Sequence, residues 1–202
     1  MINIDIFKIT KFFKLLFHFN MDIFSFTLEE ISIGKIRCNE GKYLEVFNLE
    51  VSLPKLKCIN GVCQKINPSI KKDIFFLDMK IDGEQHQDLI FRIQEIENKI
   101  ISLLENEHFN KINYFFESSI NSSDVKNRFK SSLLESNDNY YYLRIKLPHD
   151  NIKFLIPITN EESSFIEDIK FGTYLNLSII CSGIWFSNQK IGLSWNVSKI
   201  IA

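Results

Sequence analysis

The sequence predicts a β-rich α+β domain in which short strands surround one helical segment and a long hairpin closes the chain. Several segments alternate apolar and polar residues with the period of two that a half-buried strand requires. Residues 86–107 instead repeat apolar residues at helical spacing, and one short polar turn interrupts the aromatic-rich residues 172–201. The 202 residues, 45% of them hydrophobic, can bury one core, and no low-complexity linker divides them. We therefore expect a single domain over residues 21–202.

The first clear strand is "YLEVFNLEVSL", residues 43–53. Its alternation predicts one buried face, with Phe47, Leu49, Val51 and Leu53, and one exposed face, with Asn48, Glu50 and Ser52. Pro54 then interrupts the pattern, as is typical of a sheet edge or a bulge. Further strands are predicted in "DIFFLDMKID" (73–82) and "KFLIPI" (153–158).

A helical insertion is predicted at about residues 86–134. Its main helix runs from His86 to Glu107 and should pack on the strands through Leu89, Ile93, Ile96, Ile100 and Leu104. A weaker helix is predicted from Asp124 to Leu134, with Ser122 and Ser123 as candidate caps.

Residues 1–20 form a short basic amphipathic extension. Read as a helix, they place Lys8, Lys11, Lys14 and His18 on one side. Because lysines interrupt every apolar run, we expect neither a signal peptide nor a membrane span. Three interpretations stay open: a core-capping helix, an extension upstream of a start at Met21, or a helix for a membrane surface or a partner.

Charge and motifs exclude several function classes. The formal net charge of −1 argues against a broadly basic duplex binder. The sequence has no P-loop, GxGxxG, GxSxG or HExxH motif, and its four histidines lie far apart, so we expect no enzyme, no cofactor and no metal. The four cysteines, Cys38, Cys58, Cys63 and Cys181, are interpreted as reduced and mostly buried thiols, which favours an intracellular protein.

The closing hairpin carries the most specific pattern. If Asn188 and Gln189 form its tip, Ile184 faces Leu193 and Trp185 lies opposite Gly192. Leu175, Leu177, Ile179 and Cys181 then share the parity of Trp185 rather than that of Ile184, and a bulge at Ser182 and Gly183 resolves this conflict. The predicted core face is Leu175, Leu177, Ile179, Cys181, Ile184 and Phe186, and the predicted outer face is Tyr174, Asn176, Ser178, Ile180 and Trp185. Trp195 and Ile184 should therefore be buried, and Trp185 more exposed.

These faces indicate a candidate surface for nucleic acid. A large ring above glycine and serine leaves its π-face open to a base. In "NYYYLRIKLP" (139–148), aromatic residues are followed by cations on the face opposite Tyr141, Leu143, Ile145 and Leu147, which suits bases followed by phosphates. The candidate binding residues are Trp185, Tyr174, Lys190, Tyr140, Tyr142, Arg144, Lys146, Lys55 and Lys57. The alternative is that Trp185 packs under the helical insertion or at a subunit contact, and that the rest are ordinary solvated residues.

Two segments, "LEVSLPKLKCINGV" (49–62) and "SGIWFSNQKIGLSW" (182–195), resemble the phage-type single-stranded-DNA-binding proteins of nucleocytoplasmic large DNA viruses. The matching positions are Leu53, Pro54, Gly61, Ile184, Trp185, Gly192, Ser194 and Trp195. The resemblance implies an OB-fold-like barrel with inserted helices that coats single-stranded DNA during replication or recombination, in the host cytoplasm (the viral factory) or nucleus. Replication proteins and a second copy of the chain are the further partners it suggests.

Such proteins commonly carry an acidic C-terminal tail, whereas this sequence stops at "SKIIA", which leaves the recruitment of partners open. The alternative function is that of a virion structural or assembly protein whose aromatic residues anchor interfaces. A third interpretation is a transcription or replication accessory factor that binds partners but no single strand.

Overall fold

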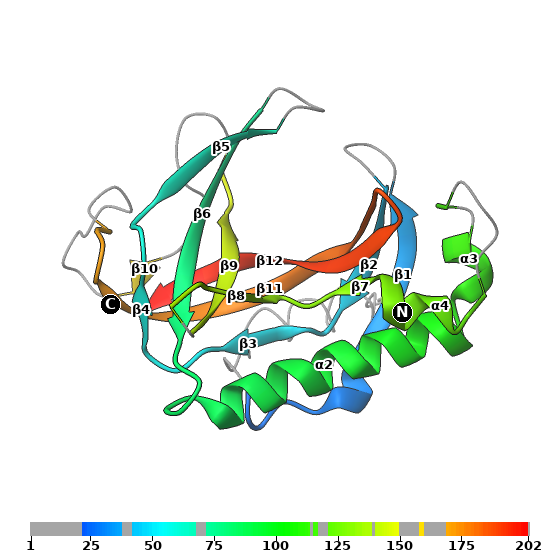
Figure 1. Ribbon diagram of the computed structural model, residues 1–202, viewed down its shortest axis with the longest axis horizontal. Helices are drawn as coiled ribbons and strands as arrows, with labels where there is room; N and C mark the ends of the chain where they lie inside the picture. Colours follow the sequence, from blue (N-terminus) through cyan, green and yellow to red (C-terminus); the bar gives the residue numbers. More distant parts are fainter. Residues whose placement is uncertain are drawn as a thin grey trace, which may run out of the picture.

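The structure is a computed structural model that describes residues 22–37, 42–67, 72–113, 115–116, 121–138, 140–149, 158–159 and 169–201 (Figure 1). The predicted extension at residues 1–20, Cys38 and the segment 153–157 lie outside the described residues.

The described strands form one sheet that closes into an OB-fold-like barrel (Figure 1). The strands are β1 (Ser32–Arg37), β2 (Lys42–Phe47), β3 (Glu50–Ser52), β4 (Leu56–Cys58), β5 (Cys63–Asn67), β6 (Lys72–Ile81), β7 (Phe129–Lys130), β8 (Leu133–Glu135), β9 (Tyr141–Leu147), β10 (Ile158–Thr159), β11 (Tyr174–Ser187) and β12 (Lys190–Ile201). The ring runs β11, β4, β6, β9, β12 and closes because β12 pairs with β11. The helices are η1 (Leu28–Glu30), α2 (Gln87–Asn106), α3 (Phe109–Asn113) and α4 (Asp124–Arg128). The predicted β-rich α+β class, with a helical segment and a C-terminal hairpin, is confirmed.

Strand β11 joins two parts of the molecule. It pairs with β4 near its start, with β3 in its middle and with β2 near the hairpin tip. In Figure 1, β5, β6 and β9 rise at one end of the hairpin, and β1 and β2 rise with its tip at the other. The two ends therefore face each other across the long strands.

The hairpin and its bulge are confirmed. Asn188 and Gln189 form the tip with φ of 47° and 60°, and Trp185 pairs with Gly192. The register shifts between Cys181, which pairs with Trp195, and Gly183, which pairs with Ser194. Gly183 has a φ of 150°, and a Cβ there would lie 2.7 Å from the Leu44 carbonyl oxygen, so only glycine fits this position.

The burial of β11 agrees with the predicted faces at all but one position. The predicted core residues Leu175, Leu177, Ile179, Cys181, Ile184 and Phe186 are all buried. Trp195 is buried as well, whereas Trp185 is partly exposed. Ser178, predicted to face outward, is buried because Ser52 of the paired strand β3 covers it, with the two hydroxyl oxygens 3.0 Å apart.

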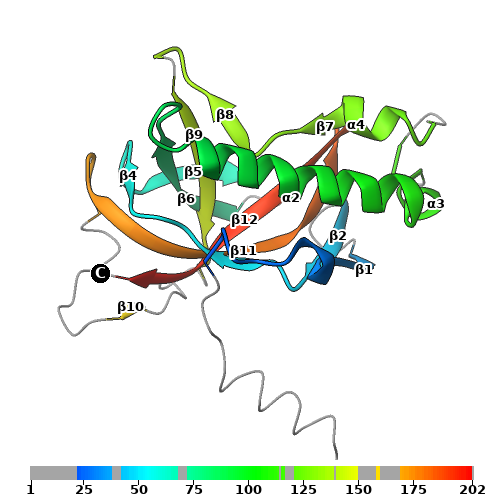
Figure 2. The same ribbon diagram turned by 90° about the horizontal axis from the view of Figure 1, so that it is seen from below.

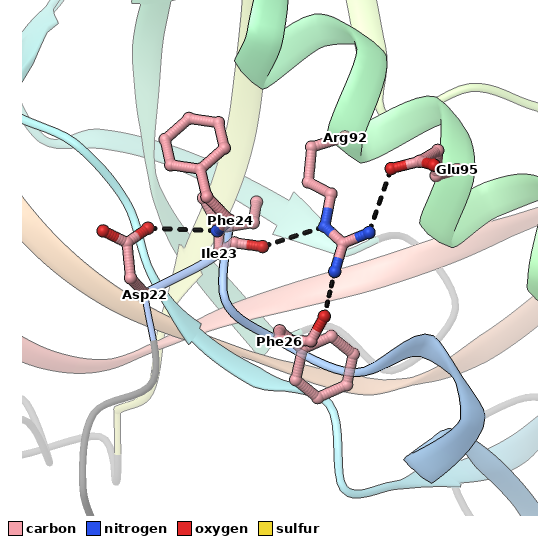
Figure 3. A network of polar contacts seen from close by, with 6 residues as sticks. All are labelled: Asp22, Ile23, Phe24, Phe26, Arg92 and Glu95. Carbon is pink, nitrogen blue, oxygen red and sulfur yellow. Dashed lines mark hydrogen bonds and ion pairs between the residues drawn. The ribbon is translucent and has the colours of Figure 1, made fainter.

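Helix α2 lies along the hairpin, below β3 and β11 in Figure 1 and across β11 and β12 in Figure 2. All five residues of its predicted apolar stripe, Leu89, Ile93, Ile96, Ile100 and Leu104, are buried. Arg92 also holds the first described residues against the helix (Figure 3). Its guanidinium donates to the carbonyl oxygens of Ile23, at 2.9 Å, and Phe26, and pairs with Glu95 at 2.9 Å.

Two further predictions were wrong. The second helix does not reach Leu134: α4 ends at Arg128, because Phe129 and Lys130 pair in parallel with β12, and Leu133–Glu135 pairs with β9. Phe47 is 47% exposed instead of buried. Asn48 has a φ of 58°, which breaks the strand and exchanges its faces, so Val46 and Leu49 are the buried residues on either side.

Candidate nucleic-acid interface

A groove of about 300 Å³ lies between the barrel strands and the hairpin. One wall comes from β5, β6 and β9, with Lys65, Ile74, Phe76, Arg144 and Lys146. The other wall comes from residues 130–134 and the hairpin, with Lys130, Ser131, Ser132, Leu134, Trp185, Leu193, Ser194 and Trp195. The closure of the barrel thus brings together residues that lie more than a hundred positions apart in the sequence.

The lining combines aromatic rings with positive charge. Its cations are Lys65, Lys130, Arg144 and Lys146, and its rings are Phe76, Trp185 and Trp195. None of the described residues in this lining carries a carboxylate. The lining therefore suits a ligand that carries negative charge and flat groups able to stack, whereas the net charge of −1 for the whole chain gave no sign of this local excess.

Trp185 is held in one orientation by the strand opposite. Its indole Nε1 donates to the Leu193 carbonyl oxygen at 3.0 Å. Its ring lies against Gly192, so closely that a Cβ on residue 192 would sit 2.6 Å from the ring atom Cε2. One face of the ring is thus covered by the backbone of β12, and the partly exposed ring borders the groove. Because the indole donor is already used, Trp185 can stack on a base but cannot read it.

The row around Trp185 adds further groups. Tyr43 pairs with Trp185 from β2, and Lys130 pairs with Gly192 from β7. Lys130 therefore lies two strands from Trp185 on the wall of the groove. This order of an aromatic residue, a glycine and a cation suits a stacked base whose phosphate lies to one side.

Arg144 is fixed between a carboxylate and two rings. Its Nε and Nη2 donate to the Asp78 carboxylate at 2.8 and 2.9 Å, and this ion pair raises the pKa of Arg144. The guanidinium carbon lies 4.3 Å from the centre of the Phe76 ring and 5.8 Å from that of Tyr142. Asp78 is 3% exposed, whereas 43% of the Arg144 side chain remains open to solvent. Arg144 is thus a rigid cation whose charge is partly offset.

Lys146 lies next to Arg144 on the same face of β9 and pairs with Phe76 on one side and Asn196 on the other. Burial in this wall lowers the pKa of its ammonium group. A phosphate at this position would oppose that lowering of the pKa, because an opposite charge stabilises the charged ammonium group.

Ser132 fixes the loop that completes the second wall. Its backbone N–H donates to the Glu97 carboxylate of α2, and its hydroxyl accepts a hydrogen bond of 2.9 Å from Trp195 Nε1. Glu97 is 6% exposed, and burial raises its pKa although the Ser132 hydrogen bonds oppose this. Helix α2 therefore supports the groove from behind.

The structure brings together only part of the predicted set. Trp185, Arg144 and Lys146 line the groove, and Tyr142 adjoins Arg144. Tyr140, Lys57 and Tyr174 lie outside it, on or next to the strands of the same sheet. Lys55 and Lys190 are exposed in the link before β4 and at the hairpin tip, and neither lines the groove.

Several lining residues were missed from the sequence. Phe76 belongs to a continuous apolar run, in which the alternation of residues does not show which side chains are buried. Lys130 was predicted to lie in a helix, whereas it lies in strand β7. Lys65 belongs to β5, a strand that the sequence did not predict. Phe76 shares its strand face with Asp78 and Lys80, and antiparallel pairing of β6 with β9 puts it beside Lys146.

Comparison with known proteins gives structural similarity only. No protein-family model and no curated protein matches the sequence. The chain is similar to the single-stranded DNA-binding protein from bacteriophage Enc34 in complex with ssDNA, with 10% identity, a TM-score of 0.47, and coverage of 86% of this chain and 94% of that one. It is also similar to gp2.5, a single-stranded DNA binding protein encoded by bacteriophage T7, with 9% identity, a TM-score of 0.45, and coverage of 75% and 84%. These neighbours are phage proteins, and a link to large DNA viruses stays a prediction.

The described part of the chain holds no group of three histidine, cysteine or acidic side chains placed to bind a metal. No described helix has the length and apolarity needed to cross a membrane. Cys58, Cys63 and Cys181 are free thiols, two of them buried and Cys63 partly so.

Proposed function

We propose that this protein binds single-stranded DNA in the groove without sequence preference. The observation that carries the proposal is the placement of Trp185, whose ring is locked by Leu193 and Gly192 beside the cations of the facing wall. Stacking on such a ring is favourable for every base, and the cations supply the attraction for the backbone. A duplex would bind less well, because its bases are already stacked and do not expose their faces.

The proposed role is protection of single strands in viral DNA replication or recombination, inside the host cell. Such binding makes and breaks no covalent bonds and uses no cofactor, so we propose that this protein is not an enzyme. Replication proteins and a second copy of the chain are its proposed partners, and the family of large DNA viruses is its proposed origin.

Fluorescence anisotropy with labelled oligothymidylate tests the proposal. Trp185→Ala should weaken binding by about 1–3 kcal/mol, the range for a base-stacking aromatic residue. Phe91→Ala is the matched control, since Phe91 is 63% exposed on α2, away from the groove lining, and this variant should bind like the wild type. Affinity should also fall with salt, by about 0.7 in log affinity per log unit of salt for each phosphate contact. Equal affinity of all three proteins would refute the role of the groove.

A further inference from the structure

A second group of aromatic residues and cations lies at the end of β11 far from the hairpin tip. Phe171 is 74% exposed and Tyr174 is 59% exposed. Lys57 of β4 pairs with Tyr174, and its Nζ lies 5.4 Å from the centre of the Phe171 ring. These three residues are called the outer patch. Two large rings left in solvent beside a cation indicate a binding surface, because a folded chain gains by burying such rings.

The backbone holds Phe171 in place. Phe171 and Gly172 form a turn in which Gly172 has a φ of 85°. The Gly172 N–H donates to the Cys58 carbonyl at 2.9 Å, and the Cys58 N–H donates to the Thr173 carbonyl at 2.7 Å. The turn is thus tied to β4 through the two residues that follow the exposed ring. The backbone under the outer patch is therefore ordered before a ligand binds, which lowers the entropy cost of binding.

An unbroken row of side chains connects the outer patch with the groove. Lys57 pairs with Lys80 of β6, and Lys80 pairs with Tyr142 of β9. The Lys80 Nζ lies 4.8 Å from the centre of the Tyr140 ring and 3.9 Å from Asp82. These paired residues lie on the sheet face opposite the buried row of Cys58, Met79 and Leu143.

The same face leads along β9 into the groove. Arg144 and Lys146 lie two and four residues after Tyr142, and both line the groove. At about 3.3 Å per residue, this step covers roughly 13 Å. The step across β9, β6, β4 and β11 covers roughly 14 Å more at about 4.8 Å per strand spacing. Aromatic and cationic residues therefore follow one path from Trp185 to Phe171.

We propose that the outer patch is a second stacking site for the same DNA strand that occupies the groove. This inference rests on the proposed function. The strand leaves the groove past Arg144 and Tyr142, crosses the Lys80 and Lys57 row, and stacks a base on Tyr174 or Phe171. The lysines favour this occupant over an apolar protein segment, because the path offers the cations Arg144, Lys80 and Lys57 as well as aromatic rings. The bound length then lies toward the upper end of the roughly 4–16 nucleotides that OB folds cover.

The test compares the affinities of short and long oligothymidylates, of about 4 and about 16 nucleotides, which are the limits of that range. The double variant Phe171→Ala/Tyr174→Ala should bind the long oligonucleotide about 5- to 150-fold more weakly than the wild type, as expected for the loss of a stacked base. It should bind the short one unchanged. Trp185→Ala should weaken the binding of both, and Phe91→Ala of neither. Circular dichroism and thermal unfolding of each variant check that the fold is retained.

The outcomes separate the two proposals. If the wild type binds neither oligonucleotide, the proposed function fails and the second site fails with it. If the wild type binds both and the double variant binds the long one equally well, the groove stands and the second site is refuted. If the double variant also loses a dimer that the wild type forms in analytical ultracentrifugation, the outer patch binds a second copy of the chain instead. An equal loss for both lengths would also refute a separate site.

Discussion

At the residue scale, the neighbours of each tryptophan decide whether its ring is available to the groove. Trp185 and Trp195 lie on opposite faces of the hairpin and both donate their indole N–H within the protein. Trp195 is 3% exposed and is a core residue that only borders the groove. Trp185 has a covered face against Gly192 and a partly exposed ring at the groove. The position of a small residue across the strand therefore decides which tryptophan can bind a base.

Gly192→Ala tests this dependence. The added methyl group would overlap the ring of Trp185, which must then leave its place over β12. We expect weaker binding of oligothymidylate, by up to about 1–3 kcal/mol, because the stacking surface is displaced. Anisotropy titration measures the affinity, and thermal unfolding measures the accompanying loss of stability.

Gly83→Ala is the matched control for that substitution. No atom lies within 4 Å of a Cβ at residue 83, so the variant should bind and unfold like the wild type. Unchanged affinity in Gly192→Ala would show that the indole does not need its place over residue 192 to bind the strand.

At the scale of elements, the sequence was most informative where one pattern runs through a whole element. Helix α2 and the hairpin were predicted almost to their ends, and the bulge followed from the parity conflict between Cys181 and Ile184. Prediction failed where partners far away in sequence decide the structure. Residues 129–130 and 133–135 form strands because β12 and β9 lie beside them, and no local propensity shows this.

The candidate site was predictable to the same extent. Trp185, Arg144 and Lys146 follow from strand alternation alone. Their meeting in one groove, and the addition of Lys65, Phe76 and Lys130, depends on closure of the ring. The order of the strands in the sheet decides which outer faces lie opposite each other, and a single sequence contains no direct signal for this order.

The contact between α2 and the groove wall predicts a pH dependence of stability. Burial raises the pKa of Glu97 above the usual value of 4.5, so the folded state holds the proton more tightly than the unfolded state does. Ionisation of Glu97 then opposes folding, and its cost grows as pH rises from 4.5 toward the raised folded pKa. Each pKa unit corresponds to about 1.4 kcal/mol.

Glu97→Gln removes this titration while keeping an oxygen that can accept from Ser132. We expect the free energy of unfolding of the variant to increase relative to that of the wild type as pH rises from 4.5 toward the raised folded pKa of Glu97. Urea unfolding of both proteins at several pH values measures the difference, and titrations common to both cancel. A relative loss of stability in the variant as pH rises would instead mean that the hydrogen bonds from Ser132 outweigh burial.

At the scale of the whole molecule, a chain with a formal net charge of −1 concentrates positive charge where its fold brings two walls together. The long strands β11 and β12 pair with each other to close the barrel, and they also form the hairpin that contains Trp185. The hairpin that contains the bulge at Gly183 therefore contributes both to a wall of the groove and to the core. Binding surface and fold stability depend on the same two strands, on opposite faces.

The central claim, that a DNA base stacks on Trp185, can be tested by fluorescence because the chain has two tryptophans. Trp195→Phe leaves Trp185 as the only indole, and Trp185→Phe leaves only the buried Trp195. On titration with oligothymidylate, we expect strong quenching in Trp195→Phe and little in Trp185→Phe, because the stacked ring alone contacts the base. If Trp195→Phe binds the oligonucleotide, as measured by anisotropy, without any change in its fluorescence, no base stacks on Trp185.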